Sequence, residues 1–202
     1  LLWRAPAARF TIVRDAAGIA GELEGDISVD GEAVALRLEL TRGFGEDTAR
    51  ALLKLDGLSG HLLSKLMPMA SDYVADDTVL TGEVRAVLAA DSGALRTVDI
   101  DLDSRLGALS GEASFASDGQ TLVGRVEFAG INPQQLATQG PELAMLSALR
   151  SELSGTADFS AWADGRIDAL DLAMKGGAGQ LELPGVSPIL IEGLARDLSR
   201  DR

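Results

Sequence analysis

The sequence contains no cysteine. This absence excludes disulfide bonds and thiolate metal sites. It leaves the compartment open, because a cysteine-free chain suits the bacterial periplasm and the cytosol equally well.

Aromatic residues are scarce, at 4% of the 202 residues, so Leu, Ala and Val must supply most of the buried surface. No run of about 18 apolar residues occurs, which excludes a membrane-spanning helix. Residues 1–6 lack the basic start and the apolar length of a signal peptide, and the chain has no initiator Met. We therefore expect an internal or C-terminal segment of a longer protein, with any targeting signal or anchor outside it.

Basic charge is also limited, because 18 Lys and Arg are scattered among 31 Asp and Glu, for a net charge of −13. Nucleic-acid binding needs clustered cations that neutralise phosphates, so we expect no nucleic-acid partner. Docking on an anionic membrane surface is disfavoured for the same reason. Apolar residues at 46% nevertheless predict a folded chain.

Alternation of apolar and polar residues dominates the chain and predicts strands with one apolar and one wet face. Val98, Ile100 and Leu102, for example, alternate with acidic residues. Turn pairs such as Asp30-Gly31 and Asp118-Gly119 separate these runs and indicate antiparallel hairpins. The predicted strands are 9–14, 20–29, 33–41, 49–56, 79–90, 94–103, 107–117, 120–129, 152–162, 165–175, 178–183 and 187–193.

Two segments interrupt the alternation and are predicted to be helical. The first runs from Ser59 to about Met69, and the second from Pro133 to about Arg150 with a kink at Pro141. Asn132 is a good N-cap before the second helix, and Gln135 has the spacing of a capping box. The predicted fold class is mainly β with two short helical insertions, its repeated antiparallel strands forming a curled, groove-like sheet.

The two helical segments and their flanks superpose at a shift of 73 residues. Gly57 then falls on Gly130, the cap Ser59 on Asn132, and Leu80 on Leu153. Such self-similarity is typical of stacked units that complete one another's core. We therefore expect the end of a preceding β unit at 1–56, one repeat unit at 57–129 and a second at 130–202, or one continuous domain.

The sequence contains no recognisable catalytic, metal-binding or phosphate-binding motif, so we expect neither an enzyme nor a cofactor. His61 is the only histidine, and Ser59 beside it is explained as a helix cap. Asp99, Asp101 and Asp103 lack the glycine and glutamate of a calcium loop, so they are expected on the wet face of a strand and no metal is predicted. Gly176 to Gly179 leads into a strand rather than a helix, which favours a tight turn over a phosphate loop.

The strand pattern resembles a known family. Residues 165–185, the strand openings Leu80-Thr81-Gly82 and Leu153-Ser154-Gly155, and residues 126–133 are similar to the recurring strands of the AsmA-like proteins of Gram-negative bacteria. The very long YhdP-like and TamB-like members are the most similar branch, and the resemblance covers most of residues 20–194. Its motifs encode strands and turns rather than a catalytic site.

The resemblance implies a role. These proteins are anchored in the inner membrane by an N-terminal helix, extend through the periplasm and curl into a groove with an apolar interior. They are implicated in moving phospholipid between the inner and outer membranes and in outer-membrane integrity. We expect acyl chains and neighbouring repeats of the same longer chain as partners. The predicted groove residues are Val98, Ile100, Leu102, Leu170, Leu172 and Met174. The alternative is a structural or adhesive β-solenoid segment of a surface protein with a packed core.

Overall fold

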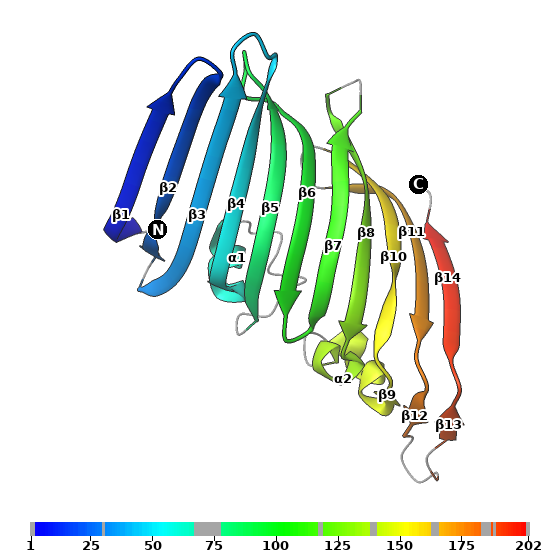
Figure 1. The fold of residues 1–202 in the computed structure, drawn as a ribbon. Helices are drawn as coiled ribbons and strands as arrows, with labels where there is room; N and C mark the ends of the chain where they lie inside the picture. The colour runs from blue at the N-terminus through cyan, green and yellow to red at the C-terminus, as the bar shows by residue number, and fades with distance from the viewer. Residues whose placement is uncertain are drawn as a thin grey trace.

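The computed structural model describes residues 3–29, 31–66, 78–116, 119–137, 141–162, 166–182, 187 and 189–200. Most of them belong to one antiparallel sheet of eleven strands, so the prediction of a mainly β fold with two short helical segments is confirmed. The sheet is open rather than closed, with β1 and β14 as its edges (Figure 1).

The strands of the large sheet follow one another almost in chain order. They are β1 (Trp3–Arg14), β2 (Gly18–Val29), β3 (Glu32–Gly43), β4 (Thr48–Ser59), β5 (Val79–Ala89), β6 (Leu95–Ser104), β7 (Gly107–Phe115), β8 (Thr121–Ile131), β10 (Leu153–Trp162), β11 (Ile167–Gly176) and β14 (Leu194–Arg200). Because each strand pairs with the next, short hairpins suffice for most connections.

A second, three-stranded sheet joins β9 (Leu149–Arg150), β12 (Gly179–Leu181) and β13 (Ile189–Ile191). The segments predicted as strands 178–183 and 187–193 form this small sheet instead of extending the large one. The strand that completes the large sheet, β14, was not predicted. Its sequence, residues 194–200, has charged residues at positions of both faces, and only its pairing with β11 defines it.

The first helical segment, α1 (Gly60–Leu66), follows β4 as predicted, and residues 67–69 of the predicted helix lie outside the described residues. The second prediction is wrong in its length. The segment is a four-residue helix, α2 (Pro133–Leu136), then a 3-10 helix, η2 (Pro141–Ala148), and then β9. Pro141 lacks the N–H that an α-helix interior needs, so one continuous helix is disfavoured there.

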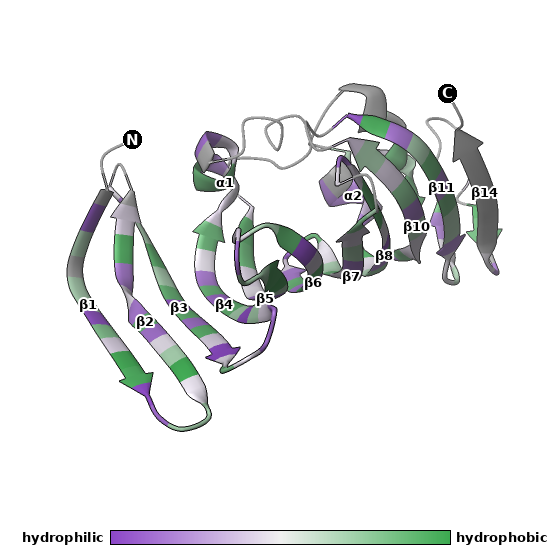
Figure 2. Ribbon diagram, turned by 90° about the horizontal axis from the view of Figure 1, so that it is seen from above, coloured by the Kyte–Doolittle hydropathy of each residue, from purple (hydrophilic) through white to green (hydrophobic). Residues whose placement is uncertain are grey.

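The two helical segments occupy equivalent positions. Gly57 and Gly130 both have a positive φ, at 82° and 65°, and each forms a bulge just before the helical segment. After each bulge the pairing resumes with Leu58 opposite Leu80 and with Ile131 opposite Leu153, which is the predicted shift of 73 residues. Seen from above, α1 and α2 lie on the same side of the sheet (Figure 2).

Candidate functional site

The register aligns one row of side-chain positions across the entire large sheet. It consists of Phe10, Leu23, Leu38, Leu53, Val84, Ile100, Gly111, Val126, Ala157, Leu172 and Leu198. Directly opposed residues of neighbouring strands lie on the same face of a sheet. Every position of the row is apolar or glycine. We call the face that carries this row the apolar face.

The six predicted groove residues lie on the apolar face. Ile100 and Leu172 are members of the same row, and Leu102 shares the next row with Met174. Val98 and Leu170 share the row on the other side. The structure therefore brings together two triplets that lie about 70 residues apart in the chain. All six side chains are half-buried, so the face is accessible at these strands.

The sequence reasoning missed how far the face extends. Phe10, Leu38, Leu53, Val84 and Val126 continue the row of Ile100 over the other strands. Their alternation was visible in the sequence, but alternation alone does not assign residues of different strands to one face. The register supplies that assignment, because a slip of one residue would turn a strand's whole apolar set to the other face.

The opposite face, which we call the polar face, carries most of the charge. Arg37 bridges Glu22 and Glu39 at 3.0 and 2.9 Å, and Arg125 lies 3.6 Å from Asp158. These exposed pairs contribute little stability individually, about 0–1 kcal/mol. Arg37 also reduces the repulsion between Glu22 and Glu39, which the register places opposite one another.

Asp99, Asp101 and Asp103 are exposed on the polar face, where Asp99 stands opposite Arg85 and Glu112. Among the described residues, no group of three or more His, Cys, Asp or Glu is arranged to hold a metal. Gly179 begins β12, so the turn at Gly176 to Gly179 leads into a strand as predicted. The three aspartates therefore belong to the solvent side of strand β6, and the glycines belong to the turn before strand β12.

Shallow hollows occur on the polar face. One of about 640 Å³ lies over β6 to β11 and is lined by Asp101, Ser110, Glu127, Thr156 and Lys175 among others. Half of its lining residues are exposed, and several of them, such as Ala108, Ala129 and Ala173, carry no polar side-chain group that could act as an acid or a base. We therefore place the candidate site on the apolar face.

Among the described residues, α1 covers the apolar face at one end of β3 to β5, and α2 lies on the same side of the sheet (Figure 2). There α1 packs Leu62 against Val34 and Leu58, with Leu55 and Leu80 beside them. Leu62 is only 2% exposed. Elsewhere in the described chain, the extensive contacts of the eleven strands are with their hydrogen-bonded neighbours. Within the described residues the large sheet is thus a single layer with an incompletely covered apolar face.

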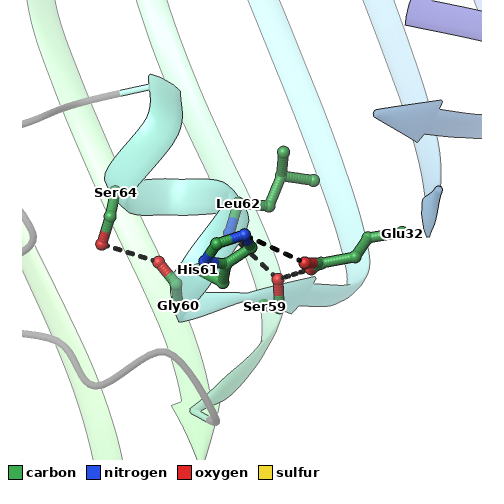
Figure 3. Close-up of polar contacts among 6 residues, drawn as sticks. All are labelled: Glu32, Ser59, Gly60, His61, Leu62 and Ser64. Atoms are coloured by element: carbon green, nitrogen blue, oxygen red, sulfur yellow. Dashed lines mark hydrogen bonds and ion pairs between the residues drawn. The ribbon is translucent and has the colours of Figure 1, made fainter. Parts of the chain in front are cut away.

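A small polar cluster fixes α1 to β3 (Figure 3). The Ser59 hydroxyl accepts a hydrogen bond from the Leu62 N–H at 3.0 Å and donates one to Glu32. His61 Nε2 lies 3.6 Å from the other oxygen of Glu32. The carboxylate stands between the hydroxyl and the imidazole, whereas a nucleophilic triad needs the imidazole in the middle. The cluster is therefore a helix cap with a histidine–carboxylate contact beside it.

The corresponding cap of the second helical segment is Asn132. Its side chain accepts a hydrogen bond from the Gln134 N–H at 3.0 Å, as an N-cap does. The second helical segment thus begins with the predicted residue even though it is shorter than predicted.

At the other end of the strands, the Ser92 hydroxyl donates a hydrogen bond to Asp91 and lowers the pKa of that carboxyl in the hairpin between β5 and β6.

The fold and this face together define an open, antiparallel β-sheet protein with one apolar face that lacks a second layer over most of its described extent. No helix among the described residues has the length and hydrophobicity to cross a membrane. Comparison of the chain with protein-family models, with curated protein sequences and with solved structures finds no match.

Proposed function

We propose that this chain is a non-catalytic module of a periplasm-spanning, AsmA-like envelope protein. In this proposal its apolar face carries the acyl chains of phospholipid between the inner and outer membranes and so supports outer-membrane integrity. The observation that carries the proposal is the uninterrupted apolar row across eleven strands, which no second layer covers in the described chain.

The physical support is the cost of exposed apolar surface. Removing such surface from water stabilises by about 25 cal/mol per Å². Monomeric proteins rarely expose contiguous apolar patches larger than a few hundred Å² unless the patch binds something. Acyl chains suit this face because they require no hydrogen bonds from it, and it offers almost none.

The two edges of the sheet support the context of the proposal. In the described chain, β1 and β14 each have one strand neighbour in the large sheet. An open edge presents unpaired N–H and C=O groups to another strand. Neighbouring repeats of the same longer chain would extend the apolar face at both edges. The anchor in the inner membrane would belong to a segment outside this chain.

Photo-crosslinking tests the proposal directly. A crosslinking residue at Ile100 or Leu172 is expected to capture phospholipid when the protein is expressed in a Gram-negative periplasm. The same residue at Asp101 or Asp171, which lie on the polar face, should capture none. Equal capture at all four positions, or none at Ile100 and Leu172, would contradict the proposal.

Leu172→Asp separates an open face from a packed core. On an open face water hydrates the new carboxylate, so the protein stays folded, its free energy of unfolding falls by no more than about 1 kcal/mol, and bound lipid is lost. In a packed solenoid the same change buries an unpaired charge and costs several kcal/mol.

The matched control is Ala173→Asp, which places the same charge next door on the exposed polar face. It should leave both stability and lipid content unchanged. Native mass spectrometry reads the bound lipid and urea titration reads the stability. An unfolded Leu172→Asp protein, with a lipid-free parent, would favour the adhesive solenoid.

A further inference from the structure

The two ends of the apolar face differ over β1 to β3. At the end where α1 lies, Val34 and Leu62 are 5% and 2% exposed. At the opposite end, where hairpins join β1 to β2 and β3 to β4, Ile12, Ile19 and Leu40 are 63%, 44% and 41% exposed. We call these the helix end and the hairpin end. Figure 1 shows α1 and α2 at the same end of the strands.

Charge distinguishes the same two ends. At the helix end the charged residue on the apolar face is Glu32, opposite Val29, and it already binds Ser59 and His61. At the hairpin end the register places Arg14 opposite Ile19 and Ile19 opposite Arg42. Arg14 and Arg42 are thus exposed residues on the two strands that flank Ile19, and the Arg42 guanidinium extends across β4 to the Ala90 carbonyl.

Neither arginine has a carboxylate partner among the described residues. Arg14 stacks over the Phe44 ring at 5.3 Å, and Arg42 donates one hydrogen bond to the Ala90 carbonyl at 3.4 Å. A guanidinium has five N–H donors, so most of those donors are available to a ligand.

The nearby carboxylates are occupied elsewhere. Asp15 accepts hydrogen bonds from the Ala17 and Gly18 N–H groups, and Glu46 accepts one from Gly43. Asp47 pairs with Arg96 at 3.3 Å. In the described chain none of these carboxylates forms an ion pair with Arg14 or Arg42.

We propose that phospholipid binds this part of the face in one orientation. The phosphate lies at the hairpin end above Ile19, where Arg42 turns from the Ala90 carbonyl to meet it opposite Arg14, and the acyl chains run along the strands toward α1. Arg14 and Arg42 lie two strand spacings apart, about 10 Å between backbones, which leaves room for one phosphate. This inference rests on the proposed function and adds the phosphate site and the orientation of the bound lipid.

The length of the strand fits one lipid. From Arg42 to Leu36 on β3 is about 20 Å at 3.3 Å per residue. The hydrocarbon of one bilayer leaflet is about 15 Å deep. The apolar-face residues in that interval are Leu40, Leu38 and Leu36, and beyond them α1 covers Val34. Acyl chains attached to a phosphate at the hairpin end would therefore end near the helix end.

Fluorescence quenching by brominated lipid measures this orientation. In a background with Trp3→Phe and Trp162→Phe, a single tryptophan is placed at Leu40 or at Leu36. The probe is phosphatidylglycerol brominated at carbons 6 and 7, or at carbons 11 and 12, of one acyl chain. Leu40→Trp should be quenched more by the first lipid and Leu36→Trp more by the second, each by about twofold.

Equal quenching of both tryptophans by both lipids would show chains lying across the strands and would overturn the orientation while keeping the proposed function. A reversed order would also overturn it. No quenching at either position would overturn the proposed function together with this inference. Circular dichroism confirms that each tryptophan variant keeps its strands.

The arginines are tested separately. Arg14→Gln with Arg42→Gln should weaken binding of phosphatidylglycerol about two- to fivefold, as expected for exposed charge pairs. It should leave binding of diacylglycerol with the same chains unchanged. The control pair, Arg9→Gln with Arg50→Gln, removes the same charge from exposed positions of the polar face. An equal loss in the control pair, or no loss in the test pair, would overturn the assignment of the phosphate site.

Discussion

Two glycines on the apolar face each lie opposite a phenylalanine of the neighbouring strand. Phe128 lies opposite Gly155, and Phe159 lies opposite Gly124. A Cβ added to Gly155 would meet the Phe128 ring at 2.7 Å, and one added to Gly124 would meet the Phe159 ring at the same distance. Each ring thus covers the backbone of the glycine across from it, a pairing known to stabilise strand glycines.

Gly155→Ala is therefore expected to destabilise the protein. The new Cβ would lie 2.1 Å from the backbone carbonyl oxygen of Ala173, so the backbone of β10 or β11 must shift. We expect the free energy of unfolding to fall by about 2 kcal/mol, measured by urea titration.

The matched control is Gly21→Ala, also on the apolar face of a strand. Its new Cβ would meet only the Leu40 Cβ, at 4.0 Å. Alanine restricts the unfolded chain more than glycine does, so this variant should be neutral or more stable by up to about 1 kcal/mol. Equal destabilisation of both variants would show that the close approach at Gly155 does not limit stability.

At the scale of the element, α1 illustrates how a short helix is held by packing and by its cap. A helix of seven residues is too short to be stable alone in water. Ser59 satisfies one of its first N–H groups, and the Ser64 hydroxyl bonds to the Gly60 carbonyl at 2.8 Å. Burial of Leu62 against the apolar face supplies the tertiary contact.

Leu62→Ala should consequently lower the free energy of unfolding by about 2–4 kcal/mol, because a nearly fully buried leucine leaves a cavity. His61→Ala in the same turn should change it by no more than about 0.5 kcal/mol, since both His61 and Glu32 keep part of their side chains in solvent, at 43% and 36% exposed. Thermal and urea unfolding of the two variants make the comparison.

A complementation assay adds the functional measurement. His61→Ala should complement fully. A large loss of function in a normally folded His61→Ala protein would contradict the assignment of this cluster to capping and would revive a catalytic or metal-binding role.

At the scale of the whole molecule, the large sheet is a linear array in which each strand contacts mainly its hydrogen-bonded neighbours. Each of its eleven strands has its extensive contacts with the strands on either side. The stability of such arrays is approximately a sum of local and nearest-neighbour contributions. An edge strand has one neighbour, so it opens at a lower free energy than a central strand.

Hydrogen exchange measured by mass spectrometry should therefore show a gradient. Amides of β5 to β7 should exchange slowest, and those of β1 should exchange at least about tenfold faster. Phospholipid bound to the apolar face should slow exchange over the large sheet. Uniform protection from β1 to β7 would contradict the one-dimensional picture and indicate a single cooperative core.

The sequence predicted those elements whose apolar alternation and turn residues lie within one short stretch of the chain. The strands β2 to β8, β10 and β11 were predicted because apolar residues alternate in them and turn residues separate them. The start of β1 was missed because Pro6 argues against a strand, yet an edge strand tolerates proline where the register shifts. The length of the second helix was overestimated because a good cap at Asn132 fixes only where a helix begins.

The sequence by itself determined most strands of the large sheet, the positions where the two helical segments begin and the sorting of each predicted strand into an apolar and a polar side, since these depend on neighbours in the chain. Only the tertiary structure decided that the apolar sides of all eleven strands align into one face, that α1 covers one end of it, and that β14 joins the edge. The physical reason is that register, bulges and packing are set between strands, where pairing energies depend on residues distant in sequence.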